Sequence, residues 1–253
     1  VERRALFCYL PAVMKIIVLG DIHANLPALE RCLSEARREG YDRLYHAGDL
    51  VGHGPFPDEV VQLIRSAGIP GVRGNWDENV AWDGEGPGPL RGDPRLLESA
   101  RLSLPWTRAN VNAINRFVLG NLPFEIRFRE GGITFCLVHA NPLDNTTYHF
   151  EDADELTFQE YGKAADVDVI LFGHTHRHYH RQVKGRHFIS VGSAGIPAES
   201  DPRTGYTVIY TGNIGKGLDV NFRRFEYDTE RVAQGYRDRG IPDPFAPVLS
   251  RTA

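Results

Sequence analysis

Residues 15–23 read KIIVLGDIH, an apolar run that ends on polar side chains. Residues 15–19 predict a buried strand, because a short continuous apolar run is typical of strands that are covered on both faces. Asp21 and His23 follow this strand at once, and carboxylates and imidazoles are side chains that bind metal ions. An apolar strand that ends on metal-ligand residues is the pattern from which we predict both the fold and the site.

The chain repeats this pattern four more times. The runs and the residues that follow them are RLYHAG (43–48) before Asp49, IPGVRG (69–74) before Asn75, ITFCLV (133–138) before His139, and VDVILFG (167–173) before His174 and His176. In α/β sheets the carboxyl ends of neighbouring strands meet at one crevice, where ligands bind. We therefore expect seven side chains to converge on one site: Asp21, His23, Asp49, Asn75, His139, His174 and His176.

Seven oxygen and nitrogen ligands are too many for one tetrahedral metal ion. They suit two divalent ions that share a bridging carboxylate. Mixed histidine and carboxylate ligands favour transition ions such as Mn, Fe, Ni, Co or Zn over Ca or Mg. The residue types therefore predict a pair of transition-metal ions.

The local backbone suggests how these ligands reach one site. Residues two apart point the same way in an extended chain, so Asp21 and His23 are expected to face one centre, as are His174 and His176. The glycines that precede Asp49, Asn75 and His174 are expected to let the chain turn sharply where it leaves the sheet.

Helical patterns separate the first strands. Apolar residues 29, 32, 33 and 36 share one helical face that ends at Gly40, residues 58–65 predict a short helix, and Thr107 is expected to cap a helix carrying apolar residues 111–118. Residues 83–94 are rich in glycine and proline and predict a surface loop. Residues 187–191, 207–210 and 218–225 predict successive strands. The chain therefore reads as α/β, with βα units first and a β-rich part after them.

The composition is that of an ordinary globular protein. The 253 residues include 29 basic and 33 acidic side chains, so the net charge of −4 does not indicate nucleic-acid binding. No run approaches the ~20 apolar residues of a membrane span. We expect residues 1–13 to be an N-terminal extension and residues 14–253 to form a single domain. The three cysteines form no zinc or disulfide motif, which favours a cytoplasmic location; homo-oligomerisation is left open.

The motifs DIH (21–23), GD (48–49), GN (74–75), His139 and GHTH (173–176) occur in the order found in the calcineurin-like metallophosphoesterases, which the chain resembles. The segments GDLVGHGPFPDEV, WTR (106–108) and VGSAGIPAESDPRTGY (191–206) resemble the bacterial phosphodiesterase branch. The resemblance implies a four-layer αββα sandwich of two mixed β-sheets flanked by helices. It also implies a binuclear phosphodiesterase of small phosphate esters, in which a metal-bridging hydroxide attacks phosphorus in line.

The same resemblance implies which residues act at the site. One metal ion would be held by Asp21, His23, Asp49 and His176. The second would be held by Asp49, Asn75, His139 and His174, so that Asp49 is the bridge and Asp49, Asn75 and His139 are catalytic. Manganese is the favoured ion.

One position departs from the pattern of this family. Many members have a histidine after the GN motif, which is thought to assist the leaving group, whereas this chain has Trp76 and Asp77. Because tryptophan is no acid at neutral pH, and general acid catalysis is worth ~10²–10⁴-fold, we expect slow turnover of substrates with poor leaving groups. His53, in a glycine-flanked loop after Asp49, is the candidate replacement acid.

Three alternatives remain at this point. A serine/threonine protein phosphatase or a dinucleoside polyphosphate hydrolase is less favoured, because Leu50, Val51 and Gly52 follow the GD motif where those branches have Asp-Arg-Gly. A non-catalytic scaffold of the same fold is the third, although a scaffold has no need to keep all seven ligand positions.

Overall fold

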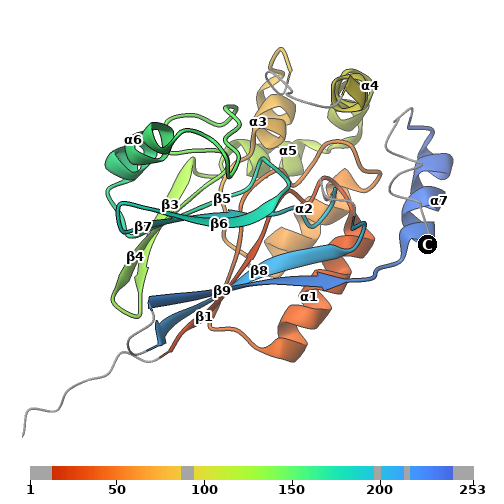
Figure 1. The fold of residues 1–253 in the computed structure, drawn as a ribbon. Helices are drawn as coiled ribbons and strands as arrows, with labels where there is room; N and C mark the ends of the chain where they lie inside the picture. Colours follow the sequence, from red (N-terminus) through yellow and green to blue (C-terminus); the bar gives the residue numbers. More distant parts are fainter. Residues whose placement is uncertain (1–12, 87–93, 197–200, 214–216, 242–253) are drawn as a thin grey trace, which may run out of the picture.

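The computed structural model describes residues 13–86, 94–196, 201–213 and 217–241 (Figure 1). The elements of this part, in chain order, are β1 (Lys15–Leu19), α1 (Leu26–Glu39), β2 (Arg43–His46), α2 (Pro57–Ser66), α3 (Asn75–Trp82), α4 (Pro94–Asn110), α5 (Ala113–Gly120), β3 (Glu125–Glu130), β4 (Ile133–Val138), α6 (Glu155–Ala165), β5 (Val169–Phe172), β6 (His178–Val183), β7 (Arg186–Val191), β8 (Thr204–Asn213), β9 (Gly217–Phe225) and α7 (Thr229–Arg239). Within these ranges, no helix combines the length and the apolar character needed to cross a membrane.

The strands form two mixed sheets. The four-stranded sheet has the order β2-β1-β8-β9, and β1 pairs with β2 in parallel and with β8 antiparallel. The five-stranded sheet has the order β3-β4-β5-β7-β6, in which β4, β5 and β7 are parallel and the outer strands β3 and β6 are antiparallel. The parallel strands of both sheets direct their carboxyl ends to one region, which is where the predicted ligands follow them.

Apolar side chains between the sheets form the central core, to which β1 contributes Ile16 and Val18. The alternate residues of β1, Ile17 and Leu19, pack on the other face with α1 and α2. Helix α6 covers the outer face of the five-stranded sheet through Phe158 and its neighbours. The layers are therefore helices, sheet, sheet and helix, as Figure 1 shows, and the predicted αββα sandwich is confirmed.

Most strands predicted from apolar runs are present, but two local predictions are wrong. Thr107 lies inside α4, and the cap of the next helix is Asn112, whose side chain accepts a hydrogen bond from the Asn115 N–H. Residues 69–73 form only an isolated bridge between Gly71 and His46, because Pro70 has no N–H to donate to a ladder. Of the predicted loop 83–94, residues 87–93 lie outside the described part, as do residues 1–12 of the predicted extension.

Candidate metal centre

The seven predicted ligands lie together at the carboxyl ends of the parallel strands. Asp21 and His23 follow β1, Asp49 follows β2, His139 follows β4, His174 and His176 follow β5, and Asn75 is the first residue of α3. Each of the seven residues lies in hydrogen-bond or ion-pair distance of at least one of the others. Asp21, His23, Asn75 and His139 are fully buried, and Asp49 and His174 are nearly so. The expected convergence therefore occurs.

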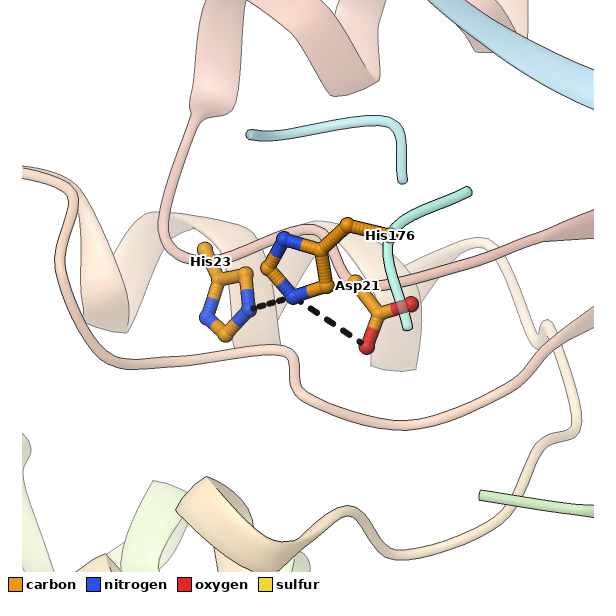
Figure 2. A group of neighbouring side chains, drawn as sticks. All are labelled: Asp21, His23 and His176. Atoms are coloured by element: carbon orange, nitrogen blue, oxygen red, sulfur yellow. Dashed lines mark hydrogen bonds and ion pairs between the residues drawn. The ribbon is translucent and has the colours of Figure 1, made fainter. Parts of the chain in front are cut away.

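His23 and His176 carry the clearest sign of a cation site (Figure 2). Their Nε2 atoms lie 3.0 Å apart. The Nδ1 of His23 donates to the Val51 carbonyl at 3.2 Å, and the Nδ1 of His176 donates to the Ile196 carbonyl at 2.8 Å. Because a neutral imidazole carries one proton, both Nε2 atoms then present lone pairs to each other. Asp21 Oδ1 lies 3.8 Å from the Nε2 of His176, so three electron-rich atoms face one point that suits a cation.

His139 and Asn75 form a second group of facing acceptor atoms beside the first group, which consists of Asp21, His23 and His176. The Nδ1 of His139 donates to the Ala47 carbonyl at 2.8 Å, so its Nε2 presents a lone pair. That Nε2 lies 2.8 Å from Asn75 Oδ1, which is also an acceptor. The donor set therefore fits a second divalent ion.

Asp49 lies between the two groups. Its Oδ1 accepts the Trp76 N–H at 2.9 Å, which fixes the carboxylate. Its Oδ2 lies 3.6 Å from the Nε2 of His23 and 3.6 Å from the Nε2 of His139. One oxygen atom is therefore equally close to a histidine of each group, as a bridging carboxylate must be.

Asp21 is near both groups as well. Its carboxylate lies in two groups of possible ligands, one with His23 and His176 and the other with Asp49 and His139. Within each group the ligand atoms lie within 4.8 Å of one another. The atom of His139 that lies 3.9 Å from Asp21 is Nδ1, which already donates to a backbone carbonyl. Both oxygens of Asp21 also accept the His174 N–H at 3.0 Å. Asp49 is therefore the better placed bridge.

His174 is held differently from the other histidines. Its Nε2 donates to the Thr146 carbonyl at 3.0 Å, so Nδ1 is the atom left to bind a cation. Its ring packs 5.0 Å from the ring of His139 and 3.9 Å from the ring of Tyr148. Among the described residues, His174 belongs to neither of the two groups whose carboxylate and imidazole atoms lie closest together, which are Asp21, His23 and His176, and Asp21, Asp49 and His139.

The backbone at the site is left-handed, so the expected alternation of an extended chain is wrong. Asp21 and His23 have φ values of 42° and 47°, and His174 and His176 have values of 62° and 57°. Of the ten non-glycine residues with positive φ in the described part, seven belong to the loops that carry the ligands. This conformation costs roughly 1–2 kcal/mol per residue, and such strain is found at functional sites.

The glycines before the ligands serve two purposes. Gly48 has a φ of 90° and turns the chain, as predicted. Gly74 and Gly173 instead allow close approach, because a Cβ on Gly74 would lie 2.0 Å from Asp49 Oδ1 and one on Gly173 would lie 2.6 Å from Asp21 Oδ2. Sharp turning is therefore the wrong explanation for these two.

The sequence reasoning missed the part played by Asp77. Its side chain is fully buried, Oδ1 accepts the N–H groups of Leu50 and Val51 at 2.8 and 3.3 Å, and Oδ2 accepts the Gly74 N–H at 3.0 Å. One carboxylate thus joins the loop after Asp49 to the turn before Asn75. An acid three residues after the residue that caps a helix, here Gly74, is a capping signal that could have revealed it.

Trp76 and His53 pack beside the first group. Trp76 is only 2% exposed, and the Cβ that Gly52 lacks would clash with its ring. The ring of His53 lies 4.2 Å from that of Trp76 and 4.8 Å from that of His23. Trp76 is therefore a packing residue, and His53 is near a ligand, where it stays a candidate acid.

The electrostatics of the site suit cations. Burial raises the pKa of Asp49 well above its usual range, and burial together with the charge of Asp49 does the same for Asp21. Burial, with the Asp49 charge, raises the pKa of Asp77 to about 7. Burial lowers the pKa of His139 to about 4 and that of His176 to about 3. Neutral imidazoles bind metal ions, and a divalent cation would offset the repulsion between the carboxylates.

His46, at the end of β2, leads to a prediction about acid stability. It is fully buried, its Nε2 has no hydrogen-bond partner in the described part, and burial lowers its pKa to about 3. Between the unfolded pKa of about 6.5 and this value only the unfolded chain takes up the proton, so stability is lost as the pH falls through this range, by about 1.4 kcal/mol per pH unit.

We expect the free energy of unfolding of His46→Phe to lack this loss of about 1.4 kcal/mol per pH unit. Urea unfolding of the metal-free protein and of the variant at pH 7, 6 and 5 measures it. A constant difference in unfolding free energy between the two proteins over these pH values would show that His46 does not titrate in this way.

Comparison with known proteins agrees with this geometry. Residues 14–213 match the family model of the calcineurin-like phosphoesterase superfamily domain. The crystal structure of a metallophosphoesterase from Sphaerobacter thermophilus superposes with a TM-score of 0.71 at 27% identity, covering 94% of this chain and 99% of that one.

Curated relatives with functional names include a phosphodiesterase and a tetraphosphatase. Phosphodiesterase YfcE of Escherichia coli is 33% identical over 78 residues, which are 27% of this chain and 42% of that protein. The symmetrical bis(5'-nucleosyl)-tetraphosphatase of Psychromonas ingrahamii is 27% identical over 178 residues, which are 69% of this chain and 58% of that protein. Both names describe the hydrolysis of phosphoric esters or anhydrides.

Proposed function

This chain belongs to the calcineurin-like phosphoesterase superfamily, and on that basis we propose that it is a phosphodiesterase that works with two divalent transition-metal ions. The observation that carries the proposal is the set of converging lone pairs. The Nε2 atoms of His23 and His176 lie 3.0 Å apart while both Nδ1 atoms donate elsewhere, and Asp49 Oδ2 is 3.6 Å from a histidine of each group.

The residues divide into two ligand sets. We propose that Asp21, His23, Asp49 and His176 hold one ion and that Asp49, Asn75, His139 and His174 hold the other, with manganese as the favoured metal. When bound, two such ions would supply Lewis-acid chemistry: they would lower the pKa of water towards neutrality and would neutralise the phosphoryl oxygens. Asp77 keeps the loops of Asp49 and Asn75 together through three backbone hydrogen bonds.

A phosphodiester is the substrate class that the chain favours. One relative is named a phosphodiesterase, and Leu50 and Val51 after the GD motif differ from the protein phosphatase and tetraphosphatase branches. The relative named a tetraphosphatase supports dinucleoside polyphosphate hydrolysis as the second candidate. The test must therefore include both classes.

We expect metal-dependent hydrolysis of activated diesters. Protein purified without chelator and loaded with Mn²⁺ should hold two ions and cleave an aryl phosphodiester, and chelation should abolish this activity until metal is restored. A panel of aryl diesters, cyclic nucleotides, glycerophosphodiesters, phosphoproteins and dinucleoside polyphosphates, tested with several metals, measures the substrate class. Alkyl monoesters should react at least ~100-fold more slowly, because Trp76 replaces the usual leaving-group acid.

Three results would contradict the proposal. Less than one metal ion per chain after Mn²⁺ or Ni²⁺ loading would favour a non-catalytic scaffold. Faster cleavage of dinucleoside polyphosphates than of any diester would favour the second candidate. A strong preference for alkyl monoesters would mean that another residue protonates the leaving group, and His53 would then be the first to replace.

A further inference from the structure

Tyr148 lies at the candidate metal centre, although no sequence motif drew attention to it. It belongs to the segment between β4 and α6, and its ring stacks on His174 with ring centroids 3.9 Å apart and planes 28° apart. The ring of Phe150 is 6.0 Å from that of Tyr148, and the guanidinium of Arg177 lies 4.9 Å over Phe150. Tyr148 is therefore held in a row of stacked groups that begins at a predicted metal ligand.

The hydroxyl of Tyr148 is available. The side chain is half-buried, and within the described residues this hydroxyl donates no hydrogen bond. By contrast, two buried tyrosines of the same part donate: Tyr179 to the His149 carbonyl at 2.8 Å, and Tyr206 to Glu39 at 2.9 Å. A rigid ring whose hydroxyl has no structural use is well suited to contact a ligand.

Two ring contacts place Tyr148 beside the metal ligands. Its ring stacks on His174, and the ring of His174 lies 5.0 Å from that of His139. One side chain therefore separates Tyr148 from the group formed by His139 and Asn75. Trp76, which stands where many family members have a histidine, is buried and packs its ring against that of His53.

We propose that the Tyr148 hydroxyl donates a hydrogen bond to a phosphoryl oxygen of the substrate at the candidate metal centre. This inference rests on the proposed function, and it adds a substrate-contacting residue from the segment after β4. Stacking on His174 fixes the ring in advance, so the hydrogen bond forms without ordering a mobile side chain.

Tyr148→Phe tests the proposal, because it keeps the stacked ring and removes only the hydroxyl. Three quantities are measured on the full chain: the affinity for Mn²⁺, the affinity of the Mn²⁺-loaded protein for inorganic phosphate, and kcat/KM for an aryl phosphodiester. We expect unchanged Mn²⁺ affinity, about tenfold weaker phosphate binding and about tenfold to a hundredfold lower kcat/KM. Tyr148→Leu, which also removes the stack, should in addition weaken Mn²⁺ binding.

The matched control is Tyr210→Phe. Tyr210, on β8, is also half-buried, but its hydroxyl donates to Glu39 of α1 at 3.4 Å. Its replacement should therefore leave Mn²⁺ affinity, phosphate affinity and kcat/KM at the wild-type values. Phosphate binding and turnover of Tyr148→Phe equal to wild type would overturn the inference and leave the proposed function intact. A parallel loss of Mn²⁺ affinity in Tyr148→Phe would overturn it too, because Tyr148 would then act only by positioning His174. Wild-type protein that holds Mn²⁺ but neither binds phosphate nor hydrolyses any ester would contradict the proposed function itself.

Discussion

Replacing Asp49 by alanine should lower the rate of ester hydrolysis by roughly a thousandfold or more, since metal ions supply several kcal/mol of transition-state stabilisation and about 1.4 kcal/mol corresponds to tenfold. The Oδ2 atom that is 3.6 Å from both His23 and His139 is lost, so two cations would face each other without a shared anion. Metal content should fall from two ions to one or fewer. Elemental analysis of the loaded variant and its kcat/KM measure the two effects.

Asp49→Asn separates charge from shape. The amide oxygen can still accept the Trp76 N–H, which Asp49 Oδ1 accepts at 2.9 Å, so the local fold should be kept while the bridging charge is lost. We expect it to lose the second ion like the alanine variant, with a smaller loss of stability. As a control, Asp166→Asn removes an exposed carboxylate that pairs with Arg186 and should change neither metal content nor rate. Near-normal activity of Asp49→Ala would show that Asp49 is not the bridge.

Asp77→Asn should damage both the fold and the metal centre without touching a predicted ligand. The buried carboxylate accepts three backbone N–H groups, and an amide replaces one acceptor oxygen by a donor. We expect the free energy of unfolding to fall by about 2 kcal/mol, because a buried donor is left unsatisfied. The affinity for Mn²⁺ should fall more than tenfold, because the loops that carry Asp49 and Asn75 lose their common anchor. Chemical denaturation and calorimetric titration with Mn²⁺ measure these effects.

Asp168→Asn is the control for a carboxylate that only stabilises the fold. Asp168 accepts the backbone N–H and the hydroxyl of Thr134 at 2.8 and 2.6 Å, near the starts of β4 and β5 and therefore at the opposite ends of these strands from the ligands. Its replacement should reduce stability and leave metal affinity unchanged. If Asp77→Asn binds Mn²⁺ as tightly as the wild type, then Asp77 does not position the ligands.

Local sequence was sufficient where hydrophobic burial decides the structure. The apolar runs of β1, β4 and β5 are covered on both faces, so their composition alone marks them as strands, and a ligand type at each end marks the crevice. No apolar run marks the strand β6, HYHRQV, because it lies at the edge of its sheet and most of its residues are polar. The Thr107 cap was wrong because α4 continues through residue 107 and Asn112 offers the better cap.

The sequence by itself therefore determined the buried strands, the crevice at their carboxyl ends and the chemical types of its seven candidate ligands, because burial and side-chain chemistry are properties of short segments. Only the tertiary structure decided that the loops carrying the candidate ligands are left-handed, that Gly74 and Gly173 make room for carboxylates, and that Asp77 and Tyr148 contact these loops. These features depend on contacts between residues far apart in the chain, such as Tyr148 with His174 and Asp21 with the His174 N–H. No local pattern encodes such contacts, because they arise only when the two sheets bring separate loops together.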